Sequence, residues 1–204
     1  VTPTGLAIDP RGRVFVVESH THFRPKDYEG PPRDRIRILE DFGSDGRARK
    51  ITTFFEGTEA TLNLAFGGSG ELFGITRSEV FVIPNAAQLD HADARQTLVR
   101  LDTKTVYPHN GLSGFVVAGD KLWIGLGLNA GEAYRVIGSD DSQCVGGGEG
   151  GGVFTCKIDG SEIRQVARGF WNPYAMCHDD KGNLFAVDND PDQLPPCRLL
   201  HVVE

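Results

Sequence analysis

Three side chains that could bind a metal ion follow one another near the start of the sequence. Glu18, His20 and His22 are two residues apart, so in an extended chain all three lie on one face. One carboxylate and two imidazoles form a suitable ligand set for a divalent metal ion. The alternative is an exposed polar loop in which Glu18 belongs to a hydrogen-bond network.

A histidine that could act as a general base lies further along the chain. His109 stands within Tyr107-Pro-His-Asn-Gly111, next to a proline and just before a strand-like run. The unperturbed pKa of an imidazole, about 6.5, suits proton transfer at neutral pH. The alternative is a structural histidine whose ring is held by hydrogen bonds inside the fold.

Two asparagines stand where a strand-like run ends or begins. Asn129 follows the run Gly125-Leu-Gly-Leu128, and its amide could orient a ligand oxygen. Asn172 follows Trp171 and directly precedes a proline, at the start of another apolar run. Both positions suit the binding of a cofactor or substrate.

An acidic segment closes the last apolar run. Asp188, Asp190 and Pro191 lie within Asp188-Asn-Asp-Pro-Asp192, whose carboxylates and carbonyls are hard oxygen ligands for Ca²⁺. The segment lacks the spacing of an EF-hand, so a calcium site here would need ligands from several loops. An ordinary Asp-rich turn is the alternative.

A repeated phrase predicts the elements that position these residues. Each copy has a small or apolar pair, a turn, and then a short apolar strand. The turn glycines, 49 to 63 residues apart, are Gly12, Gly70, Gly119 and Gly182. Strands and turns repeating at such intervals are typical of β-propeller blades. We therefore predict an all-β protein, a β-propeller in which the strand after each turn, Val14–Glu18 in the first copy, is the inner strand.

The repeats divide the chain into about three and a half blades. The predicted blades cover residues 1–57, 58–106, 107–168 and, incompletely, 169–204. The sequence opens directly on the first repeat and stops inside a strand-like run. We therefore expect it to belong to a longer propeller with six blades. A short helical turn is expected in residues 85–95, and a long loop is expected to extend through Gly152.

Charge and hydropathy argue against nucleic acid as a partner and against a transmembrane segment in this chain. The chain has 21 Lys and Arg against 28 Asp and Glu, a net charge of -7. Phosphate backbones need clustered cations, and the basic residues here alternate with acidic ones, so nucleic acid is not an expected partner. No apolar run approaches the roughly 20 residues of a membrane-spanning helix, so no transmembrane segment is expected in this chain.

The four cysteines contain no C-x-x-C pair, which excludes the usual zinc-ribbon and c-type haem spacings. Cys144 and Cys156 flank a glycine-rich loop, and Cys177 and Cys197 lie in one predicted blade. Two local disulfides are therefore favoured over four free thiols, although the sequence does not prove the pairing. Such disulfides predict a location outside the cytoplasm, in the periplasm, at the cell surface or secreted.

The same residues carry a resemblance over nearly the whole chain. The sequence resembles the propeller of a domain family provisionally designated membrane-bound dehydrogenase, which is similar to the soluble quinoprotein glucose and sorbosone dehydrogenases. The resemblance rests on Pro3-Thr-Gly-Leu6, Val16-Val-Glu-Ser-His-Thr-His22, Pro108-His-Asn-Gly111, Phe170-Trp-Asn-Pro-Tyr174 and Asp188-Asn-Asp190. Members of that family are often secreted and fused to a c-type cytochrome domain.

The resemblance implies an activity and roles for several residues. Its quinoprotein relatives hold pyrroloquinoline quinone and Ca²⁺ on the axis of a six-bladed propeller. A histidine takes the proton of the substrate hydroxyl while a hydride passes to the quinone. His109 would be that base, Asn172 matches the asparagine of an Arg-Asn-Pro motif, and Asp190 and Pro191 fall at the calcium-binding carbonyls. Trp171 replaces the arginine of that motif, and Gly125–Leu128 replaces a Gly-Asp-Gln-Gly stretch.

Three functions follow from these patterns. The first is a quinoprotein-like oxidoreductase that acts on a sugar or another small alcohol. The second is a metal-dependent hydrolase of the gluconolactonase type, in which Glu18, Asn129 or Asn172, and Asp188 would bind one divalent ion. The third is a propeller without catalysis that binds carbohydrate or protein.

Overall fold

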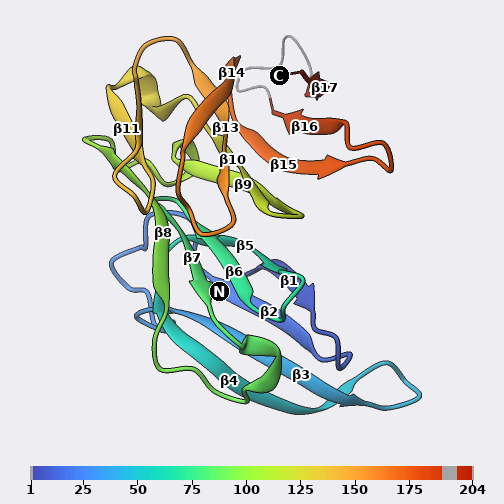
Figure 1. Ribbon diagram of the computed structural model, residues 1–204. Coiled ribbons are helices and arrows are strands. Elements are labelled where there is room, and N and C mark those ends of the chain that lie inside the picture. Colours follow the sequence, from blue (N-terminus) through green and yellow to red (C-terminus); the bar gives the residue numbers. More distant parts are fainter. Residues whose placement is uncertain (1, 190–196, 204) are drawn as a thin grey trace. The chain divides into compact units, whose positions relative to one another are not determined.

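The computed structural model describes residues 2–189 and 197–203, which form two compact units. The first unit holds residues 1–76 and 80–96, and the second holds residues 77–79 and 97–204. Within the described residues the regular structure consists of β-strands and short 3-10 helices (Figure 1). The all-β prediction is confirmed.

The first unit contains a complete four-stranded antiparallel sheet. Its strands, in the order β1-β2-β3-β4, are Thr2–Ile8, Val14–Ser19, Asp34–Phe42 and Ala48–Thr58. A second set of antiparallel neighbours follows in the order β5-β6-β7, and these strands are Thr61–Phe66, Leu72–Thr76 and Glu79–Ile83. The predicted short helical turn is present as η1 (Ala86–Gln88).

The second unit contains three groups of antiparallel strands (Figure 1). The four strands β9-β10-β13-β14 are Leu112–Ala118, Lys121–Leu126, Gly151–Lys157 and Arg164–Phe170. The three strands β15-β16-β17 are Pro173–His178, Leu184–Asp188 and Arg198–Val202. The remaining group, β8-β11-β12, comprises Gln96–Thr103, Tyr134–Ile137 and Gln143–Gly146.

In these repeats the first strand packs against the neighbouring sheet. The prediction that the strand after the turn is the inner strand is therefore wrong. In the first unit β1 packs against β5, and in the second unit β9 packs against β15. Strand β2, which includes the predicted Val14–Glu18, lies one position further from that contact. The apolar character of β2 misled the prediction, because a strand paired on both sides is buried wherever it stands in the sheet.

The contact between first strands has the same chemistry in both units. The Thr4 hydroxyl in β1 donates to the carbonyl of Thr61 over 2.8 Å, and the Ser113 hydroxyl in β9 donates to the carbonyl of Pro173 over 3.1 Å. The next residue is glycine in each strand. A Cβ atom on Gly114 would lie 2.6 Å from the carbonyl oxygen of Pro173. Glycine therefore permits the close approach of the two backbones.

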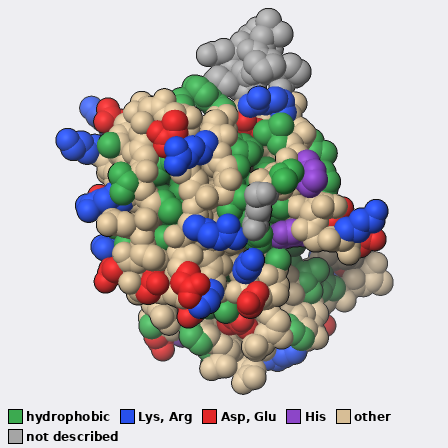
Figure 2. All heavy atoms as spheres, turned by 45° about the horizontal axis from the view of Figure 1, so that its top comes forward, with side chains coloured by type: hydrophobic (Ala, Val, Ile, Leu, Met, Phe, Trp, Pro, Cys, Tyr) green, Lys and Arg blue, Asp and Glu red, His purple; other side chains and the backbone are tan. Residues whose placement is uncertain are grey.

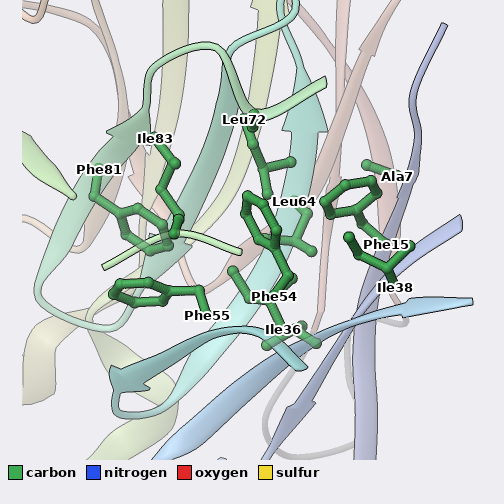
Figure 3. Packing of buried hydrophobic residues seen from close by; sticks show 13 residues of the cluster. Ala7, Phe15, Ile36, Ile38, Phe54, Phe55, Leu64, Leu72, Phe81 and Ile83 are labelled. Atoms are coloured by element: carbon green, nitrogen blue, oxygen red, sulfur yellow. The ribbon is translucent and has the colours of Figure 1, made fainter. Parts of the chain in front are cut away.

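The core of the first unit is rich in aromatic side chains. Figure 3 shows Phe54 and Leu64 in the middle of the cluster, with Phe15 on one side of them and Phe55 and Phe81 on the other. Phe15 meets Phe54 edge-to-face, with ring centroids 5.0 Å apart, which is a favourable arrangement for two aromatic rings. In the second unit a separate cluster joins Trp123 and Val153 to residues of β15-β16-β17.

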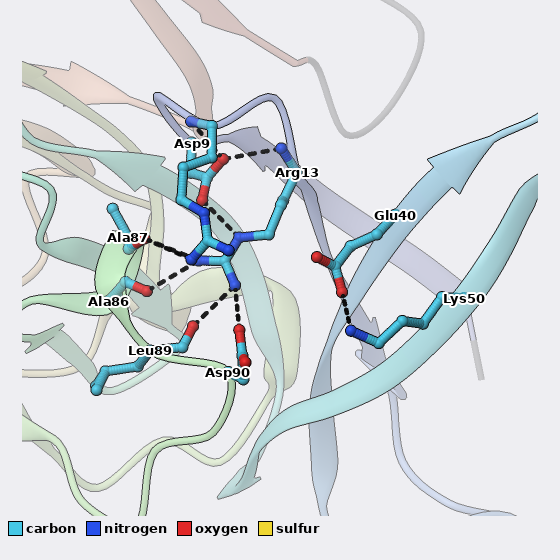
Figure 4. A network of polar contacts seen from close by, with 9 residues as sticks. Asp9, Arg13, Glu40, Lys50, Ala86, Ala87, Leu89 and Asp90 are labelled. Carbon is cyan, nitrogen blue, oxygen red and sulfur yellow. Dashed lines mark hydrogen bonds and ion pairs between the residues drawn. The ribbon is translucent and has the colours of Figure 1, made fainter.

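A buried arginine closes the turn between β1 and β2 (Figure 4). The guanidinium of Arg13 donates to the Asp9 carboxylate over 2.7 Å and to the backbone carbonyls of η1 and of the following residues. It also donates to Asp90 over 2.9 Å. Only 4% of Arg13 is exposed, and its carboxylate and carbonyl partners offset the cost of burying the charge.

The expected long loop before Gly152 contains a β-hairpin instead. Strands β11 and β12 pair with each other, and β11 also pairs with β8 rather than with the sheet that flanks the insertion. Glu149 then fixes the glycine-rich segment after β12, because its carboxylate accepts from the Tyr134 hydroxyl over 2.9 Å and from the Gly147 N–H over 2.7 Å. Burial and this carboxylate raise the pKa of Tyr134 to about 12.

The predicted disulfides are wrong in this structure, because all four cysteines are free thiols. Cys144 lies in β12 and Cys156 in β13, and these strands belong to different sheets. Cys156 is buried, whereas Cys177 and Cys197 are exposed. Their spacing in the sequence could not reveal that the β11-β12 hairpin carries Cys144 onto another sheet.

Candidate functional site

The candidate site is built around Asn172, directly before β15. The carboxylate of Asp188, at the end of β16, accepts from the backbone N–H of Asn172 over 2.6 Å and from that of Trp171 over 3.2 Å. The carbonyl of Asn172 accepts from the N–H of Asn189 over 3.4 Å. The backbone around Asn172 is therefore held on both sides, and only 6% of the residue is exposed.

The side-chain amide of Asn172 has unused hydrogen-bonding capacity. Its Oδ1 atom is buried, and no group among the described residues donates to it. A Cβ atom on Gly127 would lie 2.9 Å from this oxygen and 3.2 Å from the Cα of Asn110. The absence of a side chain at Gly127 thus lets the loop after β10 pack closely against this amide and against the turn that contains Asn110.

The loop after β10 links that turn to Trp171. The Gly127 N–H donates to the carbonyl of Gly111 over 2.9 Å, and the Leu128 N–H donates to the carbonyl of Trp171 over 2.7 Å. The end of β10 is thereby fixed between the segments that precede β9 and β15. These two backbone bonds bring together two of the regions singled out in the sequence, around His109 and around Asn172.

The backbone of His109 belongs to η2 (Pro108–Asn110), directly before β9. Its side chain lies outside what the structure describes. Arg77 contacts the segment before this turn through its guanidinium, which donates to the carbonyls of Thr105 and Tyr107. Sequence analysis missed Arg77, since a lone arginine between two strands has the pattern of an ordinary solvated turn.

Asn129 is fully buried in η3 (Asn129–Gly131) and has a structural role. Its Nδ2 atom donates to the Thr103 hydroxyl over 2.9 Å and to the Glu132 carbonyl over 3.0 Å. Its Oδ1 atom has no partner among the described residues. The amide therefore joins η3 to the end of β8, and only its oxygen remains available to a ligand.

Asp188 is committed to interactions within the protein. Besides the two N–H groups, its carboxylate binds Arg198 over 2.7 Å, and its side chain is fully buried. An acidic group with three partners has little capacity left for a calcium ion. The other predicted calcium ligands, Asp190 and Pro191, lie outside the described residues.

Glu18 is likewise occupied. Its carboxylate pairs with Arg35 over 2.7 Å and lies 3.8 Å from Arg37. The Nδ1 atom of His20 lies 3.0 Å from the carbonyl of His22. The structure thus gives Glu18 a place in a hydrogen-bond network and does not assemble these three side chains. Within the described ranges, no three His, Cys, Asp or Glu side chains are grouped so as to hold a metal ion.

Two pKa shifts near the candidate site have burial as their cause. Burial lowers the pKa of Arg77 and raises the pKa of the Tyr174 phenol, two residues after Asn172.

Figure 2 shows Lys and Arg side chains mixed with Asp and Glu over the face in view, without a continuous basic patch. This distribution agrees with the acidic composition.

A family model described as "Domain of unknown function (DUF7133)" matches residues 1–201. The chain belongs to this family. A comparison with curated proteins finds no match. The family membership therefore brings no assigned activity with it.

Comparison with solved structures shows which fold this chain has. A protein provisionally assigned as a gluconolactonase superposes with a TM-score of 0.56 at 15% identity, covering 97% of this chain and 62% of the other. The quinone-binding (PQQ) domain of pyranose dehydrogenase from Coprinopsis cinerea, in its holo form, gives 0.53 at 14% identity, covering 97% and 47%. A gluconolactonase from Xanthomonas campestris gives 0.47 at 12% identity, covering 97% and 60%.

The first two matches show that the fold is a β-propeller, of which the chain forms a part. The chain spans less than two thirds of the length of either protein. Among the described residues, no helix has the length and apolar character required to cross a membrane.

Proposed function

We propose that this chain is part of a propeller oxidoreductase that oxidises a sugar or another small alcohol, with pyrroloquinoline quinone as the hydride acceptor. The observation that carries the proposal is the buried, unpartnered amide oxygen of Asn172 beside Gly127. A buried polar atom without a partner costs about 1–3 kcal/mol, which a bound ligand would offset. The backbone of His109 lies in the turn next to it.

The residues present fit a quinone in part. The Asn172 amide would bind it, because a side-chain amide offers both donors and an acceptor to a planar ligand with carbonyl groups. Trp171, which stands where the related dehydrogenases have an arginine, would offer ring surface instead of a cation.

The chemistry assigned to the chain's own residues is proton transfer and orientation. His109 would accept the hydroxyl proton of the substrate as its carbon–oxygen single bond becomes a carbonyl. Asn172, fixed through its backbone by Asp188, would orient the reacting groups. The quinone, when bound, would supply the acceptor for the hydride that leaves the same carbon.

The calcium site is not supported by the described side chains. Asp188 is already bound by two N–H groups and Arg198, so we assign no step to a metal ion. The same observation disfavours the hydrolase alternative, which needs Asp188 and Glu18 as metal ligands, whereas Glu18 is bound by Arg35. The hydrolase and the binding module remain alternatives that activity measurements separate.

The setting of the enzyme completes the proposal. We place it in the periplasm, at the cell surface or among secreted proteins, with a c-type cytochrome domain as electron acceptor. The predicted disulfides no longer support this location, because the four cysteines are free thiols. Both statements therefore rest on the resemblance to the secreted, cytochrome-fused dehydrogenase family.

The test is a titration of the full-length protein with pyrroloquinoline quinone, followed by absorbance and by thermal unfolding. We expect stoichiometric binding and a rise in Tm. Asn172→Ala should bind at least about tenfold more weakly, because it removes the amide that meets the ligand. Asn183→Ala, which alters only the β15-β16 turn, is the matched control.

Two results would contradict the proposal. Quinone binding that is equal in the wild type and in Asn172→Ala would remove Asn172 from the site. Hydrolysis of a sugar lactone without any redox acceptor, together with no quinone binding, would favour the gluconolactonase-type alternative.

A further inference from the structure

One arginine contacts the segment before the His109 turn. Arg77 lies in the short connection between β6 and β7. Its Nε atom donates to the carbonyl of Tyr107 over 2.8 Å, and its Nη2 atom donates to the carbonyl of Thr105 over 2.5 Å. The planar guanidinium thus binds two carbonyls at once, which the single ammonium of lysine cannot reproduce with the same geometry.

The same residue also contacts the segment after the turn. The backbone carbonyl of Arg77 accepts from the N–H of Leu112 over 2.8 Å. A Cβ atom on Gly111 would lie 2.4 Å from that carbonyl oxygen, so a glycine is required there. Arg77 therefore holds both flanks of η2, the turn that contains His109.

Other hydrogen bonds within the segment are long. The N–H groups of Thr105, Tyr107 and Asn110 each reach their acceptors over 3.4 Å. Bonds from a charged donor are roughly twice as strong as neutral ones. The contacts of the guanidinium are therefore stronger restraints on the segment that leads into η2 than these three bonds are.

The guanidinium is directed to the turn rather than to an acid. Within the part of the chain that the structure describes, no carboxylate forms an ion pair with Arg77. Burial of the group lowers its pKa. Half-burying the guanidinium costs desolvation free energy, and its hydrogen bonds to the two carbonyls offset that cost. Arg77 therefore contributes to the structure of the segment that it contacts.

We propose that Arg77 is a positioning residue, which holds the His109 turn in the place where proton transfer occurs. The catalytic part of the inference rests on the proposed function, and the structural part rests on the three hydrogen bonds above. Arg77 itself touches neither substrate nor quinone in this account. It acts through the backbone of residues 105–112.

The structural part is tested by hydrogen–deuterium exchange on the full-length protein. Arg77→Lys and Arg77→Ala are compared with Arg135→Lys, which alters an exposed ion pair with Asp102. We expect faster exchange in residues 104–112 in both Arg77 variants and unchanged exchange there in Arg135→Lys. If Arg77→Ala does not fold, Arg77→Lys decides the result alone.

Two exchange results would overturn the inference. Unchanged exchange in residues 104–112 would show that other contacts hold the turn. Faster exchange throughout the chain, with a large fall in Tm, would show a general effect on folding.

The catalytic part is tested by steady-state kinetics over pH. We expect kcat to fall about 10- to 100-fold in Arg77→Lys, because a small displacement of a catalytic group has effects of this size. KM should change less than about threefold, since bound substrate does not contact Arg77. Equal kcat and an identical pH profile would overturn the positioning role. An inactive wild type would refute the proposed function, while the exchange result would still decide whether Arg77 holds the turn.

Discussion

Asp188 and Asn172 are joined by a hydrogen bond of 2.6 Å, from the backbone N–H of Asn172 to the carboxylate of Asp188. The bond connects the end of β16 to the residue before β15, so an acidic side chain fixes the start of the strand beside it. Arg198 in β17 neutralises the same carboxylate. A residue that the sequence suggests as a calcium ligand is therefore the anchor of the candidate site.

This role predicts a loss of stability in Asp188→Asn. The variant removes the charge that binds Arg198 and weakens the bonds to Trp171 and Asn172. The weakened bonds to the buried carboxylate cost about 1–3 kcal/mol in the free energy of unfolding, and the ion pair adds little because 44% of Arg198 is exposed. Denaturant titration should show this loss, whereas Asp102→Asn, at an exposed pair, should cost under about 1 kcal/mol. Equal effects of the two variants would contradict the anchoring role.

The hydroxyl contacts between first strands predict smaller, parallel losses. Ser113→Ala leaves the carbonyl of Pro173 without its donor, and Thr4→Val does the same to Thr61. Each variant should reduce the free energy of unfolding by about 1 kcal/mol. Urea titration of both variants measures this, and stability unchanged in both would show that these bonds contribute nothing.

Gly114 should not tolerate a side chain. Its Cβ in Gly114→Ala would meet two backbone oxygens of β15, at 2.6 and 2.7 Å, and backbone cannot move aside as a flexible side chain can. Overpacking of this kind costs about 1–3 kcal/mol. Gly68→Ala is the matched control, because a Cβ there meets nothing within 4 Å. A fall in Tm confined to Gly114→Ala is expected, and identical melting of both variants would be the contrary result.

The repeat was readable from the sequence because each turn carries a glycine at the same point, and the first and fourth turns are closed in the same way. Gly12 and Gly182 have φ of 81° and 83°, the left-handed conformation that glycine adopts without strain. Asp9 and Asp179, three residues before them, each accept two backbone N–H bonds within the turn. Local chemistry determines these turns, and local chemistry is visible in a sequence.

Contacts between distant segments could not be predicted in the same way. Arg77 binds backbone carbonyls of residues about thirty positions away. Every residue has a backbone carbonyl, so the residue types at those positions do not reveal the contact. The β11-β12 hairpin pairs with β8, an arrangement that depends on the path of the insertion rather than on its composition. The position of Asn172 next to Pro173 was evident, but its binding to Asp188 was not.

The thiols differ in environment, which predicts different reactivities. Burial raises the pKa of Cys156 to about 12, so at pH 8 this thiol stays protonated and unreactive in the native protein. Cys177 and Cys197 are exposed and should react readily. Labelling at pH 8, located by peptide mass, should modify these two and leave Cys156 unmodified until the protein unfolds. Resistance of Cys177 and Cys197 to labelling unless a reductant is added would indicate a disulfide between them.

The most direct test of the central claim is turnover by the full-length protein supplied with pyrroloquinoline quinone, an aldose or polyol, and an artificial electron acceptor. We predict reduction of the acceptor that depends on both quinone and sugar. The rate should fall by about 100-fold or more in His109→Ala, which removes the proposed general base, and it should also fall in Asn172→Ala, while Asn183→Ala keeps the wild-type rate. Failure of the quinone-loaded wild type to oxidise any aldose or polyol would contradict the account.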